Sequence, residues 1–304
     1  MSLLIVGTVA FDEVETPYGK SGKILGGAAT YIGLAASQYT KEINLVSVVG
    51  GDFPQEHKDL LKKYSINTDG LKVIPEGKTF FWAGKYHKNM NNRDTLVTDL
   101  NVLADFDPIL PEGYKTSKYL MLGNLTPAIQ RRVIEQMTER PKLICMDTMN
   151  FWMNIALDDL LGVLKMIDVL TINDEEAQQL SGENNVVLAA EKILTMGPKF
   201  LIVKKGEHGA LLFADGKMFH AAAMPLNAVV DPTGAGDTFA GGFMGYIAKT
   251  QDISFENMKK ALIHASAMAS FTVEKFGTDR LTEINEADVK TRIKDFYNLV
   301  SFEI

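Results

Sequence analysis

The sequence predicts an α/β protein with a mostly parallel central sheet and helices on both faces of that sheet. Short apolar segments alternate with longer segments of helical periodicity along most of the 304 residues, which is the pattern of repeated β-α units. The apolar segments show no polar–apolar alternation, so both faces of each strand are expected to be buried, as in a parallel sheet.

Six segments are expected to form the central strands, because each is short and apolar throughout. They are residues 3–8, 43–49, 119–122, 143–146, 169–172 and 200–203. Apolar residues recur at helical spacing in seven further segments. These are residues 28–38, 55–64, 127–138, 186–196, 235–249, 255–273 and 286–298. We expect one domain that covers residues 1–304.

Residues 78–98 interrupt the alternation. An aromatic, β-prone run at 78–86 is followed by a turn at 89–92 and a second β-prone run at 94–98. Residues 11–16 and 21–25 are expected to add two short strands. We expect a small β lid formed by about 11–25 and 78–98, and the alternative is a hairpin without a functional role.

Composition excludes several classes of protein. The chain is 46% hydrophobic and 23% charged, as is ordinary for a globular protein. Its formal net charge of -7 argues against nucleic acid as the main partner. Cys145 is the only cysteine, so no internal disulfide can form. A chain without a disulfide suits a reducing compartment, and no signal peptide or membrane span is apparent. We therefore expect a cytoplasmic protein.

The most informative segment is Asp-Pro-Thr-Gly-Ala-Gly-Asp at residues 231–237, directly before an apolar helical run. Glycines and bare N–H groups at a helix start form an anion site. A carboxylate at Asp237 would repel a phosphate there, unless it deprotonates the hydroxyl that attacks the phosphate. The alternative is an acid that only complements the helix dipole.

Two other phosphate-binding motifs are excluded. The dinucleotide fingerprint requires a third glycine where Phe239 stands, and the Walker motif requires a first glycine where Val14 stands. No other strand is followed by a dinucleotide fingerprint, so a dehydrogenase is less well supported.

Four motifs in order resemble those of the ribokinase-like (PfkB-type) carbohydrate kinases. They are Gly26-Gly27, Asn173-x-x-Glu176, the run Lys204-Lys205-Gly206-Glu207-His208-Gly209-Ala210, and the segment at 231–239. The resemblance implies a three-layer α/β/α fold with a mostly parallel sheet. It also implies phosphoryl transfer from ATP, with Mg²⁺, to an alcohol group.

The resemblance assigns roles on the donor side. Asp237 matches the catalytic base, and Gly234, Ala235 and Gly236 match the anion hole. Asn173 and Glu176 match a motif that positions Mg²⁺ through water and phosphate. Asp231 falls where the family often binds a monovalent cation such as K⁺. The residues assigned to ATP are Lys204, Gly206, Gly209, Thr233, His264 and Gly277; for His264 a structural role is the alternative.

The acceptor side departs from the family pattern. Asp12 matches an aspartate that binds substrate hydroxyls, and Gly26 and Gly27 match the diglycine beside it. Where the family often has an asparagine after the diglycine, this chain has Thr30 or Tyr31. The family's arginine after the middle strand is also missing. The reaction type is therefore better supported than the substrate.

Polar residues that follow the central strands are further candidates for the acceptor site, because ligands bind at the carboxyl ends of strands in open α/β sheets. Asn124 follows the strand at 119–122, and Asp147 and Asn150 follow the strand at 143–146.

Four functions remain open. The first is a kinase for the hydroxymethyl group of a sugar, and the second is a nucleoside kinase. A sugar-phosphate kinase would need cations such as Lys85, Lys88 and Arg93 to hold the second phosphate. The fourth is a sugar- or nucleotide-binding protein without turnover. We also expect a homodimer formed through the lid, where residues 80–82 are aromatic.

Overall fold

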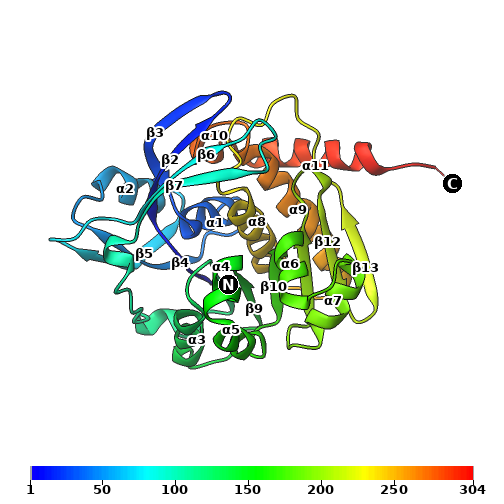
Figure 1. The fold of residues 1–304 in the computed structure, drawn as a ribbon, viewed down its shortest axis with the longest axis horizontal. Coiled ribbons are helices and arrows are strands. Elements are labelled where there is room, and N and C mark those ends of the chain that lie inside the picture. Colours follow the sequence, from blue (N-terminus) through cyan, green and yellow to red (C-terminus); the bar gives the residue numbers. More distant parts are fainter. Residues whose placement is uncertain (1, 304) are drawn as a thin grey trace.

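A nine-stranded sheet runs through the centre of the molecule. The computed structural model describes residues 2–303, and its strands lie in the order β13-β12-β11-β10-β9-β8-β1-β4-β5. All neighbours from β11 to β5 are parallel, while β12 and β13 add an antiparallel edge (Figure 1). The predicted fold class is confirmed.

The bounds of the elements follow. The central strands are β1 (Leu3–Val6), β4 (Ile43–Gly50), β5 (Ile66–Ile74), β8 (Tyr119–Leu122), β9 (Leu143–Asp147), β10 (Val169–Asn173), β11 (Phe200–Lys204), β12 (Ala210–Ala214) and β13 (Lys217–Ala221). The helices are α1 (Ala28–Ala36), α2 (Gln55–Lys63), α3 (Pro127–Gln136), α4 (Asn150–Ile155), α5 (Leu157–Leu164), α6 (Asp174–Ser181), α7 (Val186–Leu194), α8 (Ala235–Thr250), α9 (Phe255–Thr272), α10 (Asp279–Glu283) and α11 (Glu286–Val300).

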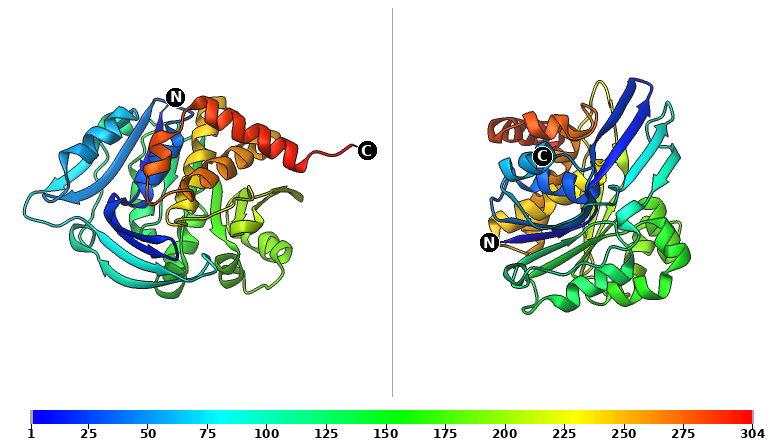
Figure 2. Two further views of the ribbon diagram at one scale, coloured as in Figure 1. Left: turned by 90° about the horizontal axis from the view of Figure 1, so that it is seen from above. Right: turned by 90° about the vertical axis from the view of Figure 1, so that its left-hand side faces the viewer.

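Two apolar cores lie on the two faces of this sheet. Successive residues of a strand point to opposite faces, so Leu3 and Ile5 join one core and Leu4 and Val6 the other. Helices α1, α2, α8, α9, α10 and α11 cover the first face, and α3, α4, α5, α6 and α7 cover the second. Figure 2 shows the resulting three layers. Burial on both faces explains why the inner strands β1, β4, β8, β9, β10 and β11 are largely apolar.

A second, four-stranded sheet stands beside the body. It consists of β2 (Ala10–Thr16), β3 (Gly19–Gly26), β6 (Phe81–Tyr86) and β7 (Arg93–Asp99), in the order β3-β2-β6-β7. In the right-hand view of Figure 2 its strands project away from the central sheet. We call it the small sheet. Strand β2 leads directly from β1, so the small sheet rises from the carboxyl end of a central strand.

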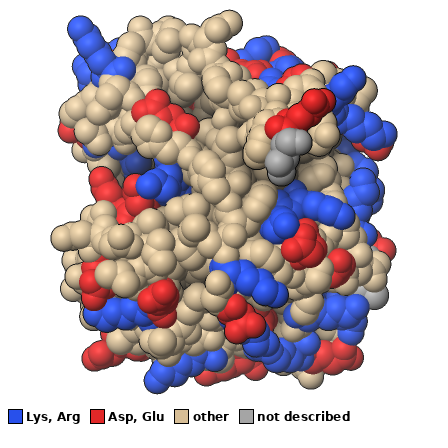
Figure 3. Space-filling model, turned by 90° about the vertical axis from the view of Figure 1, so that its right-hand side faces the viewer, with Lys and Arg blue, Asp and Glu red and all other residues tan. Residues whose placement is uncertain are grey.

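The surface gives two limits on function. No helix within residues 2–303 is long and apolar enough to span a bilayer. Figure 3 shows acidic and basic side chains interspersed on the face that it draws, with a recess at its left edge where both kinds meet. That face therefore offers no continuous basic surface of the kind that binds a phosphate backbone.

Candidate active site

The site lies at the carboxyl ends of the central strands, where the order of the strands reverses. The chain passes from β1 to β4 on one side and later returns to β8 on the other side of β1. In open α/β sheets such a switch point is where ligands bind. Polar residues end three neighbouring strands here: Asp147 ends β9, Asn173 ends β10, and Lys204 ends β11 directly opposite Asn173.

Helix α8 begins at this edge without a side-chain cap. Its first residue follows Gly234, whose φ of 73° is left-handed and favours glycine. The Ala235 N–H donates to the Pro232 carbonyl at 3.2 Å. Asp237 lies in the first turn. A Cβ added to Gly236 would lie 3.3 Å from Lys204 Nζ, so the lysine ammonium lies beside the bare start of the helix.

Lys204 links the acids of this site. Its Nζ contacts the Asp147 carboxylate at 3.1 and 3.3 Å. Burial disfavours the lysine charge, but Asp147 and Glu176 outweigh it and raise the pKa of Lys204 above its usual value. The ammonium is therefore charged at neutral pH. A fixed cation beside a helix N-terminus suits a phosphate.

Asp237 has a pKa suited to proton transfer near neutrality. Burial is the main cause that raises its pKa to about 7, and Asp147 adds to it, while Lys204 and Arg93 oppose it. A general base is most effective when its pKa lies near the working pH. Asp237 can therefore accept a proton at pH 7 and release it again.

Asn173 and Glu176 hold each other at the start of α6. The Glu176 N–H donates to Asn173 Oδ1 at 2.8 Å, and the Asn173 N–H donates to Glu176 Oε2 at 2.7 Å. Burial raises the pKa of Glu176 to about 7. Within residues 2–303, no three acidic, histidine or cysteine side chains converge on a metal site. An amide oxygen and a carboxylate are ligand types that Mg²⁺ takes while it keeps most of its water.

Asp12 lies across the site on β2 and is 5% exposed. It accepts a hydrogen bond from the Gly27 N–H, and burial together with Asp231 raises its pKa to about 7. A Cβ on Gly26 would lie 1.9 Å from Asp12 Oδ2. Gly27 has a φ of 91°, and its Cβ would lie 2.6 Å from the Thr8 carbonyl. Gly26 therefore makes the space that this carboxylate occupies, and Gly27 lets the chain pass close to the Thr8 backbone.

Asp231 is buried and held by backbone. It accepts the Thr233 N–H on Oδ1 at 2.8 Å and the Gly277 N–H on Oδ2 at 2.9 Å. The Thr233 hydroxyl donates to Tyr86 Oη at 3.2 Å. Gly277 thus lies beside β3, where its Cβ would lie 2.6 Å from Ile24 Cδ1.

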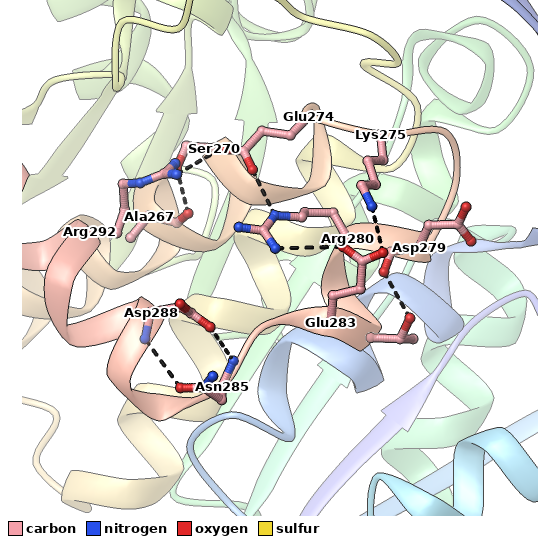
Figure 4. Close-up of polar contacts among 11 residues, drawn as sticks. Ala267, Ser270, Glu274, Lys275, Asp279, Arg280, Glu283, Asn285, Asp288 and Arg292 are labelled. Carbon is pink, nitrogen blue, oxygen red and sulfur yellow. Dashed lines mark hydrogen bonds and ion pairs between the residues drawn. The ribbon is translucent and has the colours of Figure 1, made fainter.

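The turn that carries Gly277 is held by an ion-pair network between α9, α10 and α11 (Figure 4). Glu274 accepts from Arg280 Nε at 2.8 Å and from Arg292 Nη2 at 2.6 Å. Arg292 also lies 4.1 Å from the centre of the Phe271 ring. The network therefore ties the turn to two helices.

We expect Glu274→Gln to lower the free energy of unfolding by about 1–2 kcal/mol, because two half-buried arginines lose a charged partner. Urea denaturation measures this change. Glu283→Gln is the control: Glu283 lies on the exposed side of the same network, and we expect little change. Equal stability of both variants would contradict the role of Glu274.

Arg93 of β7 also faces this group of acids. It lowers the pKa of Asp237 and of Glu176, and its guanidinium lies 5.7 Å from the centre of the Trp82 ring. Asn91, in the turn before β7, has its Oδ1 3.7 Å from a Cβ placed on Gly206. The hairpin therefore reaches from this group of acids to the Gly206 loop. In the sequence Arg93 stood out only as one of three hairpin cations.

Three further candidates lie next to this site. Gly206 and Gly209 enclose a tight turn after β11, in which the Gly209 N–H donates to the Gly206 carbonyl at 3.1 Å. The Asn124 carboxamide accepts from Trp152 Nε1 at 2.8 Å and lies at the end of β8.

Two candidates make contacts elsewhere. His264 stacks on Tyr246 with ring centres 4.1 Å apart, and its Nδ1 lies 3.2 Å from Tyr39 Oη. Asn150 donates to Gln179 Oε1 at 2.8 Å. Each of the two side chains therefore has a polar partner within the protein.

Comparison with known proteins identifies a family. Residues 6–285 match the model of the pfkB family carbohydrate kinases. A cytidine kinase of Thermococcus kodakarensis is 28% identical over 251 residues, which cover 81% of this chain and 88% of that protein. A nucleoside kinase of Methanothermobacter thermautotrophicus is 27% identical, and the matched region covers 97% of this chain and 95% of that protein.

Solved structures share the fold. The nucleoside kinase of Methanocaldococcus jannaschii superposes with a TM-score of 0.78 at 22% identity, covering 97% of this chain and 99% of that one. A putative ribokinase II from E. coli, in complex with ATP and Mg²⁺, gives 0.80 at 19% identity, with 97% and 99% covered. The chain belongs to the pfkB family of carbohydrate kinases, and it is a phosphotransferase with an alcohol group as acceptor.

Proposed function

We propose that this pfkB family kinase transfers the γ-phosphoryl group of ATP to the hydroxymethyl group of a sugar, with Asp237 as the general base. The observation that carries the proposal is the position of Asp237. Its carboxylate lies in the first turn of α8, beside Lys204, and its pKa is about 7. A base poised near neutrality at an anion-binding helix start suits phosphoryl transfer to an alcohol.

The residues of the chain divide the work. Asp237 takes the proton of the acceptor hydroxyl. At the same time the hydroxyl oxygen forms its bond to the γ-phosphorus of ATP, and the bond between that phosphorus and the ADP oxygen breaks. Gly234, Ala235 and Gly236 let the phosphoryl group approach the start of α8. Lys204 neutralises charge on the transferred group.

Asn173 and Glu176 would hold Mg²⁺ through its water. When bound, the ion supplies charge neutralisation across the ATP phosphates. We propose Asp231 as the anchor of a monovalent cation, because its carboxylate is buried at the turn before α8 and is held in place by the Thr233 and Gly277 N–H groups. Exchange of K⁺ for a bulky organic cation, with turnover as readout, tests this second ion.

The acceptor is a free sugar or a nucleoside. Asp12 is a buried carboxylate that can accept two hydroxyl donors, as a diol requires. A nucleoside is favoured by the relatives that cover 81% and 97% of the chain, which are named cytidine kinase and nucleoside kinase. A sugar phosphate is less favoured, because Lys85 is paired with Glu15 at 2.8 Å and Lys88 is exposed, which leaves Arg93 to hold the second phosphate.

We further propose a single kinase domain in which the small sheet acts as a lid and as a dimer contact. Strand β7 exposes Leu96 and Val97, which suits burial against a second copy. Light scattering tests the dimer, and a monomer at micromolar concentration would contradict it. Cys145 is buried and free, which suits our proposal of a cytoplasmic location.

Arg93→Gln tests the lid. We expect kcat to fall by about 100-fold, the effect of removing one charge-stabilising donor from an active site. Steady-state kinetics with ATP and acceptor varied separately measure it. Lys88→Gln removes an exposed charge from the same hairpin and should leave kcat unchanged. If both variants keep full turnover, the hairpin does not reach the reacting groups.

One screen tests the proposed function. Free sugars, nucleosides and sugar phosphates are each incubated with MgATP, and the release of ADP is measured. We expect release with sugars or nucleosides. Binding of acceptor and ATP without release of ADP would instead support a binding protein, and release only with sugar phosphates would revive the third acceptor class.

A further inference from the structure

The Tyr31 hydroxyl is a polar atom buried without a partner. Tyr31 lies in the first turn of α1 and is 1% exposed. Its Oη has no hydrogen-bond partner within residues 2–303. A buried hydroxyl without a partner destabilises the folded state. Such an atom in a native site requires a reason.

The tyrosine ring supports the start of α8. A Cβ placed on Gly234 would lie 2.5 Å from Tyr31 Cζ and 2.6 Å from both Cδ atoms. The ring face therefore packs directly against this glycine. The packing fixes the ring, and with it the place of the hydroxyl that Cζ carries.

Three carboxylates of the site act electrostatically on the Tyr31 hydroxyl. Burial, followed by the charges of Asp12, Asp231 and Asp237, raises the pKa of Tyr31 well above its usual value. The phenol therefore keeps its proton at any working pH and remains a donor. Tyr119 differs in this respect: its hydroxyl is also buried without a partner, but burial alone raises the pKa of Tyr119.

We propose that the Tyr31 hydroxyl donates a hydrogen bond to an oxygen of the acceptor held between Asp12 and Asp237, and so selects the acceptor. The inference rests on the proposed function. Thr30 and Tyr31 stand where the family often has an asparagine after the diglycine. A fixed phenol reaches further from the helix than a carboxamide, so it selects an acceptor with an oxygen at one particular place.

The specificity follows from the cost of an unmade bond. A site built to bind a hydroxyl discriminates strongly against the analogue that lacks it, because the buried polar group is then left unpaired. The enzyme should therefore discriminate between acceptors that differ by one ring hydroxyl. Removal of the phenol oxygen should abolish that discrimination.

The test compares Tyr31→Phe with wild type and with Tyr119→Phe. Cytidine, D-ribose and their 2-deoxy and 3-deoxy counterparts serve as probes. We expect Tyr31→Phe to lower kcat/KM for the preferred acceptor by about 10- to 100-fold, with KM for ATP unchanged. With wild type, one deoxy probe should show a kcat/KM lower than that of the preferred acceptor by the same factor. With Tyr31→Phe, the kcat/KM of that probe should not fall further. Tyr119→Phe should behave as wild type.

Stability measurements separate this role from a structural one. Both Tyr→Phe variants remove an unpartnered hydroxyl, so neither should lower Tm without ligand. The rise in Tm caused by each probe gives a readout independent of turnover. If wild type turns over no probe, the proposed function fails for these acceptors, and a smaller probe-induced rise in Tyr31→Phe alone still supports the inference. Equal kcat/KM and equal Tm shifts in both variants, or no binding of any probe to wild type, would overturn it.

Discussion

Asp237→Asn is expected to lower kcat by about 10³-fold, within the range for loss of a general base. The amide keeps the shape of the carboxylate but cannot take the proton of the acceptor hydroxyl. Binding of ATP and acceptor should persist, because Lys204 and Asp12 are unchanged. Single-turnover kinetics and calorimetric titration measure the two effects. Near-normal turnover in this variant would refute the assigned base.

The same substitution should stabilise the protein at alkaline pH. The pKa of Asp237 is about 7 in the folded state and about 3.8 in the unfolded state. The folded state therefore prefers the protonated form, and stability falls as pH rises from about 4 to about 7. At pH 8 the asparagine variant should have a higher Tm than wild type, and at pH 4 the two should differ little.

Asp158→Asn is the matched control for both measurements. Asp158 also lies in the first turn of a helix, α5, but it is exposed. Its loss should change neither turnover nor the pH dependence of Tm. A similar loss of activity in this variant would show that the effect comes from net charge and not from position.

The sequence predicted the central strands well because burial on both faces leaves a clear apolar pattern. Strand β5 was missed: it lies at the edge, and only Ile66 and Leu71 are buried in it. The hairpin of β12 and β13 was also missed. Strand β13 is mostly exposed, so its composition does not distinguish it from a loop.

The parts of the candidate site whose residues lie close together in the sequence were predictable. Gly234 to Asp237 form one turn, and Asn173 and Glu176 form one capping box. Contacts across the sequence were not predictable. Arg93 and Lys204 are 111 residues apart in the sequence, yet both lower the pKa of Asp237. Only the folding of the hairpin over the central sheet brings them together.

Lys204→Met is expected to lower kcat by about 10²- to 10³-fold, because it removes a preorganised cation from the site of the transferred group. Its second effect is on pH dependence. Lys204 lowers the pKa of Asp237, whereas Asp147 raises it. Loss of the lysine also leaves the Asp147 carboxylate without its partner at 3.1 Å. The pKa of Asp237 should therefore rise above 7.

The direction of the expected change in the pKa of Asp237 makes Lys204→Met a sharp test of the assigned base. A base must be deprotonated to act, so a higher pKa of Asp237 moves the acid limb of the kcat/KM profile to higher pH. The profile of the variant should be displaced toward alkaline pH, with part of the lost activity recovered at pH 9. Lys205→Met removes the same charge one residue further on and should leave the midpoint in place. An unmoved midpoint in Lys204→Met would mean that Asp237 does not titrate in the profile. A midpoint that moves only in Lys204→Met ties the lysine, the base and the turnover to one site.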